Sequence, residues 1–201
     1  MLQAQRALSI TASDNDAAVV HETLALLPVE FVKWIELARI DVRVLEFGEK
    51  FVDVAKRYKC HDSTDFGIVE GLYAMADRQV IIKRNDPAVL AHELFHVADF
   101  LLGDGDKMRS QLDDRVAKAY RRHDRRRSSG DGIFISSYAS VNQVEFVAET
   151  GRAALGFSEQ PPGRPHDLER LKLIDPELVD LVQSWLADIK AKMSSLQPAP
   201  S

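Results

Sequence analysis

The stretch 92–96, His-Glu-Leu-Phe-His, constrains this chain more than any other part of its sequence. Side chains four residues apart lie one above the other on the same face of an α-helix. On a helix, His92 and His96 can therefore offer two imidazole nitrogens to one metal ion, and Glu93 falls beside them. The spacing favours a metal site over two unrelated solvated histidines, which is the alternative interpretation.

The flanking residues predict that this stretch lies inside a helix. Asp86 can cap the helix N-terminus, and Pro87 suits its first turn. At the other end, Gly103 follows the apolar Leu101 and Leu102 as a helix stop does. The two histidines are therefore expected to share one helix face.

The residue types at this spacing predict zinc chemistry. Neutral histidines bind Zn²⁺, and the ion lowers the pKa of a bound water to about 7. A glutamate beside the ligands can take a proton from that water. We expect one Zn²⁺ per chain, bound by His92 and His96, with Glu93 as general base and then as proton donor to the leaving amine.

A catalytic zinc ion usually has three protein ligands and an open fourth position. One common pattern places a glycine three residues and a histidine six residues after the second His, but these positions hold Asp99 and Leu102. A helix predicted over 142–155 instead carries Glu145 and Glu149 on an otherwise apolar face. A buried carboxylate is costly unless it is paired or bound to metal.

The third ligand is therefore expected from Glu145 or Glu149. His123 and Asp104 are rivals that lie in polar, loop-like sequence.

Composition and charge exclude several classes of protein. The 201 residues are 45% hydrophobic, which suffices for one core. A net charge of −5 gives no overall reason to expect nucleic acid or an anionic membrane as partner. No apolar run approaches the ~20 residues that span a bilayer. Residues 1–16 lack the features of a signal peptide, so we expect a cytoplasmic protein or export by a non-classical route.

The hydrophobic periodicity predicts an α+β fold, mostly helical, with a small mixed sheet. In zinc proteases with this histidine–glutamate motif the edge strand of such a sheet lies beside the zinc site, and we expect the same arrangement here. We expect one domain with four parts: a loose segment 1–13, helices and a strand over 14–64, a catalytic core over 65–157, and a connector and helix over 158–201. Helices are predicted from Asp14, again after Pro28, and over 51–58, 107–122, 142–155 and 176–193. Strands are predicted over 40–45, 66–75 and 79–83, the last as an inner strand and 66–75 as an edge.

A basic run follows the predicted metal-binding helix. Arginine and lysine recur from Arg115 to Arg127 with few acids between them. Such a run is ordinarily a solvated face, and the alternative is a surface for an acidic partner or substrate segment. Only Tyr120 interrupts the charges with an aromatic ring, so nucleic acid is not expected.

The chain resembles the zinc protease domain shared by anthrax lethal factor and the Pro-Pro endopeptidases, which has a gluzincin-like HExxH-plus-Glu motif. The likeness rests on 92–99, His-Glu-Leu-Phe-His-Val-Ala-Asp, and on Ser-Tyr-Ala at 137–139 and Glu-Phe-Val-Ala-Glu at 145–149. It implies that Glu145 is the third zinc ligand and that Tyr138 faces the scissile carbonyl. The pattern departs from the family at Phe95, where the family often has Gly, and in the long basic insert.

The resemblance also implies how substrate binds and what the protein does. The edge strand at Gly71, Leu72 and Tyr73 would hold an extended substrate through its backbone groups. The activity would be that of a zinc metalloendopeptidase cleaving a specific protein, as a toxin or effector does. Apart from the resemblance, we expect Asp99 or Glu149 to orient a ligating histidine, as carboxylates behind such ligands commonly do.

Two other hypotheses use the same residues. A regulatory protease of the ImmA/IrrE type also joins HExxH to a later helix acid, although the spacing of Tyr138 and Glu145 favours the first family. A zinc-stabilised binding module that uses the arginine-rich face would need no enzyme activity. The intact Glu93 argues against it, because a structural zinc site has no use for a general base.

Overall fold

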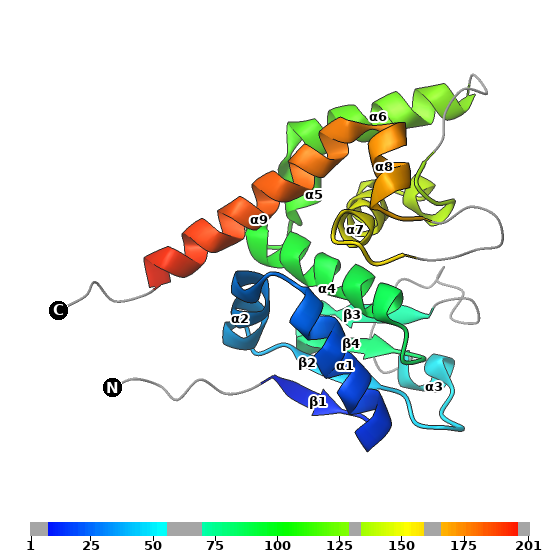
Figure 1. Ribbon diagram of the computed structural model, residues 1–201, viewed down its shortest axis with the longest axis vertical. Helices are drawn as coiled ribbons and strands as arrows, with labels where there is room; N and C mark the ends of the chain where they lie inside the picture. The colour runs from blue at the N-terminus through cyan, green and yellow to red at the C-terminus, as the bar shows by residue number, and fades with distance from the viewer. Residues whose placement is uncertain (1–7, 56–69, 129–133, 159–165, 197–201) are drawn as a thin grey trace. The chain divides into compact units, whose positions relative to one another are not determined.

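The structure is a computed structural model that describes residues 8–55, 70–128, 134–158 and 166–196 (Figure 1). The described residues form an α+β fold, mostly helical with one small mixed sheet, as the sequence predicts. None of the helices in this part of the chain combines the length and the apolar character needed to cross a membrane.

The chain divides into two compact units, Met1–Leu94 and Phe95–Ser201. The boundary falls inside the helix α4 (Pro87–Leu102), which is continuous through it. The first half of α4 therefore belongs to the first unit and the second half to the second.

The first unit contains a four-stranded sheet in the order β1-β2-β4-β3. The strands are β1 (Ser9–Thr11), β2 (Asp41–Val44), β3 (Gly71–Ala74) and β4 (Gln79–Ile82). β1, β2 and β4 run parallel, and β3 pairs antiparallel with β4 at the edge. Val80, Ile81 and Ile82 are all fully buried, which confirms that β4 is an inner strand.

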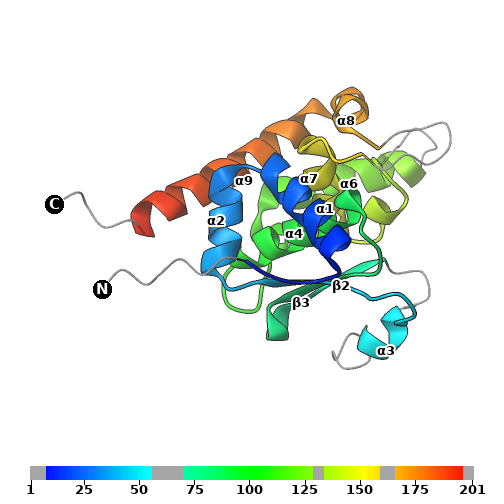
Figure 2. The ribbon, with the colours of Figure 1, turned by 60° about the horizontal axis from the view of Figure 1, so that its bottom comes forward.

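Helices cover both faces of this sheet. They are α1 (Asp14–Leu26), α2 (Val29–Leu37) and α3 (Phe51–Ala55). Figure 2 shows α1 and α2 above the strands and α3 below them. Phe51 and Val54 of α3 form a cluster with Ile81, and Leu72 packs against it. Leu72 is directly opposite Ile81 in the β3–β4 pair, so both side chains point to the α3 face.

The second unit is helical. Besides the end of α4 it contains α5 (Arg109–Leu112), α6 (Asp114–Ser128), the 3₁₀ turn η2 (Tyr138–Ser140), α7 (Gln143–Ala154), α8 (Leu168–Ile174) and α9 (Pro176–Leu196). α7 packs against η2, α5, α6, α8 and α9, and every residue from 146 to 154 is buried. α7 is therefore the central helix of this unit.

Two predictions differ from the structure, and one helix was missed. The segment 1–13 is not loose throughout, because Ser9–Thr11 pair with β2 as β1. The predicted single helix over 107–122 is wrong, since α5 and α6 are separated at Asp113. The short helix α8 was not predicted, although Asp167 caps it by accepting a hydrogen bond from the Arg170 amide at 2.9 Å.

Asp113 explains the break between α5 and α6. Its carboxylate accepts hydrogen bonds from the Arg115 side chain at 2.7 and 3.0 Å and from Trp185 Nε1 at 3.2 Å. Burial alone would raise the pKa of Asp113, but these hydrogen bonds outweigh it and lower the pKa to about 2. The charged carboxylate also accepts from the Arg115 amide at 3.0 Å, so Asp113 caps the start of α6.

Some predicted segments lie outside the described residues. They are 1–7, the helix residues 56–58, the strand residues 66–69, the connector residues 159–165 and the tail 197–201.

Candidate metal site

The helix α4 carries both predicted histidine ligands, and its N-terminus is capped as the sequence predicts. Asp86 Oδ1 accepts hydrogen bonds from the amides of Ala88 at 2.8 Å and Val89 at 3.3 Å, and Pro87 is the first helical residue. His92 and His96 are one turn apart on this helix, 6% and 8% exposed. The continuous helix backbone therefore places the two imidazoles on one face.

The first turn of α7 carries Glu145. Asn142 caps this helix, with Oδ1 accepting from the amides of Val144 at 2.8 Å and Glu145 at 2.9 Å. These bonds satisfy amides that have no partner inside the helix. The cap therefore fixes the backbone from which Glu145 projects.

His92, His96 and Glu145 form a group that could hold a metal ion. One ligand atom of each lies within 4.8 Å of the others. His96 Nε2 and Glu145 Oε2 are 3.3 Å apart. Two ligands each about 2.0–2.1 Å from a tetrahedral ion would lie roughly 3.3 Å apart. The group therefore fits one ion with a nitrogen, nitrogen and oxygen donor set. Glu149, the second glutamate of α7, is not in the group.

Glu93 is buried beside the edge strand of the sheet. Its side chain is close to Gly71, the first residue of β3: a Cβ built at Gly71 would lie 2.6 Å from Glu93 Oε1 and 2.8 Å from Val89 Cγ1. Only glycine leaves room for the carboxylate at this position. The edge strand thus passes directly beside the residue predicted to be the general base.

The side chains of the other two residues of the predicted substrate strand are partly buried or buried. Leu72 is partly buried against the α3 cluster, and Tyr73 is 7% exposed. Burial raises the pKa of Tyr73 to about 12. The Tyr73 side chain therefore belongs to the core. That the backbone of Leu72 and Tyr73 binds substrate remains a prediction.

Asp99, predicted to orient a histidine, lies one turn after His96 and is 1% exposed. It accepts hydrogen bonds from the Ser110 amide and hydroxyl, each at 2.6 Å. Burial raises the pKa of Asp99, and these two hydrogen bonds and the electrostatic influence of His96 act in the opposite direction. Asp99 therefore ties α4 to α5, and its orienting role stays a prediction.

Glu149, the second predicted orienting residue, is bound by a residue that the sequence analysis did not single out. Arg152 Nε and Nη2 donate to its two carboxylate oxygens at 3.0 and 2.7 Å. Arg152 is fully buried and also donates to the carbonyls of Phe157 at 3.1 Å and His166 at 3.3 Å. Residues three apart on a helix can form an ion pair, so the spacing of Glu149 and Arg152 indicates that pair. Nothing in the neighbouring sequence indicates that Arg152 is buried.

The remaining predicted site residues are placed as follows. Tyr138 is the first residue of η2 and is 45% exposed. The rival ligand His123 is buried with Nε2 2.9 Å from Asp175 Oδ2, and Asp104 lies in a turn with Lys107. Among the described residues, neither rival belongs to a group that could hold a metal ion.

Phe95 departs from the family pattern, and α7 accommodates it. The ring is 1% exposed and stacks on Trp185 with centroids 6.2 Å apart and planes inclined by 12°. A Cβ built at Gly151 would lie 2.4 Å from the Phe95 ring. The missing side chain at Gly151 therefore supplies the space for the large residue between the metal ligands.

No protein-family model matches the chain, and no curated protein matches it. The resemblance to the lethal factor domain therefore remains a prediction based on the motif residues.

Proposed function

We propose that this chain is a zinc-dependent endopeptidase in which His92, His96 and Glu145 hold the ion. The observation that carries the proposal is a group of three residues that could hold a metal ion, together with Glu93, a buried carboxylate outside that group on the helix of the two histidines. A structural zinc site is usually closed by four protein ligands, whereas three ligands and an open position are typical of catalytic sites.

Each residue has a separate task in the proposed reaction. Zn²⁺ held there would supply Lewis-acid chemistry, polarising the substrate carbonyl and lowering the pKa of water to about 7. Glu93 takes a proton from the attacking water and then gives it to the leaving nitrogen of the cleaved peptide bond. Tyr138 donates its phenol proton in a hydrogen bond to the former carbonyl oxygen as negative charge develops there.

The edge strand β3 supports a protein or peptide as the substrate. Its outer edge can add an extended chain through backbone hydrogen bonds, and Gly71 brings this edge next to the Glu93 carboxylate. A substrate bound in this way would lie antiparallel along Gly71–Ala74. The motif resemblance favours a specific protein target, as for a toxin or effector.

Peptide-library cleavage by the purified chain and its Glu93→Gln variant tests the proposal. We expect the variant to retain its zinc and its fold and to lose ~10²–10⁴ in rate, because only the general base is removed. Glu22→Gln, an exposed position on α1, is the matched control and should cleave like the wild type. Purified protein without zinc, or a Glu93→Gln variant that cleaves at the wild-type rate, would contradict the proposal.

A further inference from the structure

The basic run from Arg115 to Arg127 does not form one uniform surface. On the side of α6 that faces α9, the arginines are already paired. Arg115 is bound by Asp113 and donates to Ser184 Oγ at 3.0 Å. Arg122 donates to Glu177 at 2.9 Å and is also hydrogen-bonded to Asp175.

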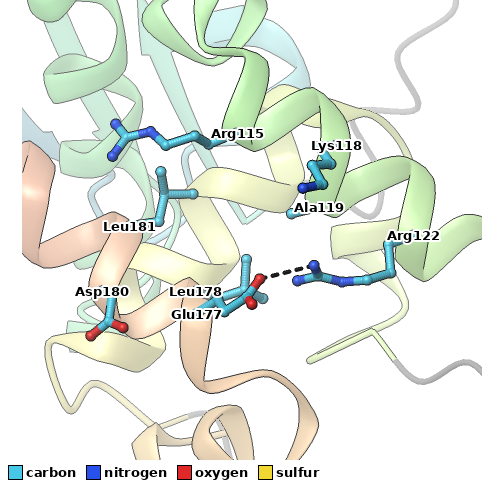
Figure 3. A pocket seen from close by; sticks show the side chains of 8 residues that line it. All are labelled: Arg115, Lys118, Ala119, Arg122, Glu177, Leu178, Asp180 and Leu181. Carbon is cyan, nitrogen blue, oxygen red and sulfur yellow. Dashed lines mark hydrogen bonds and ion pairs between the residues drawn. The ribbon is translucent and has the colours of Figure 1, made fainter.

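A pocket of about 290 Å³ lies on this paired side, between α6 and α9. Figure 3 shows the side chains that line it. Arg115, Lys118 and Arg122 line it from α6, and Glu177 and Asp180 line it from α9. These two acids, together with Asp113 and Asp175, which pair with Arg115 and Arg122, offset the basic residues here. This side therefore offers little net positive charge to a partner.

The solvent side of α6 is different. Arg121 and Arg125 are four residues apart and both exposed, whereas Val116, Ala119 and His123 are the buried positions of the helix. In the described part of the chain, no acidic side chain forms an ion pair with Arg121, Arg125 or Arg127. We call these three residues the arginine face.

The helix dipole explains only part of this arrangement. Basic residues in the last turn of a helix are stabilised by its C-terminal partial charge, which accounts for Arg125 and Arg127. Arg121 lies before the last turn, and neighbouring arginines repel one another. Because the whole chain carries a net charge of −5, the arginine face is a local exception that an acidic partner would complement.

The arginine face is attached to the segment that leads into the metal site. Arg127 Nη1 donates to Ser140 Oγ at 2.8 Å, and Tyr120 OH donates to the Ser140 carbonyl at 2.9 Å. On either side of Ser140, Tyr138 is 45% and Val141 is 59% exposed. The next residue, Asn142, caps the helix that carries the metal ligand.

We infer that the arginine face, together with Tyr138 and Val141, docks an acidic segment of the protein substrate. Exposed tyrosine and arginine beside an apolar residue is the composition of protein interfaces. A nucleic acid fits less well, because the Tyr120 ring is packed against Phe134 and Phe146 and cannot stack on a base. That the docked segment is a substrate rests on the proposed peptidase function.

Binding of a peptide probe tests the inference separately from catalysis. The probe is a fluorescein-labelled peptide rich in Asp and Glu, and its anisotropy is measured with the full-length zinc-loaded Glu93→Gln chain, which should leave it intact. We expect Arg121→Gln/Arg125→Gln to weaken binding roughly tenfold, as for two exposed charge pairs, and added salt to weaken binding further. Lys33→Gln/Lys50→Gln removes the same charge from two exposed positions of the first unit and should bind like the parent.

Equal affinity of the two double variants for the probe would overturn the inference. Tighter binding of a single-stranded oligonucleotide of the same charge would also overturn it, because the arginine face would then be a nucleic-acid-binding surface. If the arginine variant loses the probe but the wild-type chain cleaves no library peptide, docking stands and the peptidase proposal fails. If peptides are cleaved with equal kcat/KM by the wild type and the arginine variant, without preference for acidic residues, the peptidase stands and docking fails.

Discussion

The first turn of α7 and the turn that follows it each place a glutamate on the same helix face, in different surroundings. Glu145 is 17% exposed in its side chain and lies 3.3 Å from a ring nitrogen of His96. Glu149 is 3% exposed and bound through both oxygens by the guanidinium of Arg152. An arginine is always charged and neutralises its partner, whereas an imidazole nitrogen and a carboxylate oxygen can bind one metal ion together.

This difference assigns separate tasks to the two ends of α7. The first turn supplies Glu145, a member of the group that could hold a metal ion. The Glu149–Arg152 pair joins the helix to the chain that follows it through the Phe157 and His166 carbonyls. Substitutions at the first turn should therefore change metal binding and rate, and substitutions beyond it should change stability.

Glu145→Ala is expected to have the largest effect. The variant lacks one of the three proposed ligands. Mutation of a residue that only hydrogen-bonds to a ligand typically lowers metal affinity ~10–100-fold, so the loss here should be larger. Hydrolysis should be lost as well. Metal content after titration with a competing chelator measures the affinity. Full zinc occupancy in this variant would contradict the contrast between Glu145 and Glu149, because Glu145 would then not be a ligand.

Glu149→Ala should lower the free energy of unfolding by about 3–5 kcal/mol, because it leaves Arg152 charged and buried without its carboxylate. Urea unfolding measures the loss. Replacing the pair by Glu149→Leu/Arg152→Leu should recover much of it, since two apolar residues avoid the unpaired charge. A folded, stable Glu149→Ala protein that has lost its zinc would instead make Glu149 part of the metal site.

Tyr138→Phe keeps the ring and deletes the hydrogen-bond donor. We expect kcat to fall by ~10–10³ while zinc content and thermal stability hold, because the donor acts on charge that develops during the reaction. Steady-state kinetics on a cleaved library peptide separate kcat from KM. An unchanged kcat would leave Tyr138 as a surface residue of η2 and remove its link to catalysis.

Gly151→Ala should have the smallest effect of the four. The added methyl group meets the Phe95 ring, and overpacking a core typically costs about 1–3 kcal/mol. Thermal unfolding should show the loss, and Phe95→Leu in the same chain should reduce it. Zinc content should not change, so a Gly151→Ala protein with weakened metal binding would show that the packing under the ligands also sets their geometry.

The sequence alone determined the parts of this protein that depend on residues close together along the chain. The cap at Asp86, the one-turn spacing of His92 and His96 and the cap at Asn142 all involve positions at most four residues apart, so their geometry follows from the helix itself. The inner position of β4 likewise follows from its continuous apolar run.

Only the tertiary structure decided the features that join distant segments. Ser9–Thr11 became a strand because β2, some 30 residues later, supplies its hydrogen-bond partners. The break at Asp113 depends in part on Trp185, and the division of the basic run depends on the acids of α9. The choice of Glu145 over Glu149 has the same origin: both acids fit the local pattern equally well, and only packing brought one to an imidazole and buried the other against Arg152.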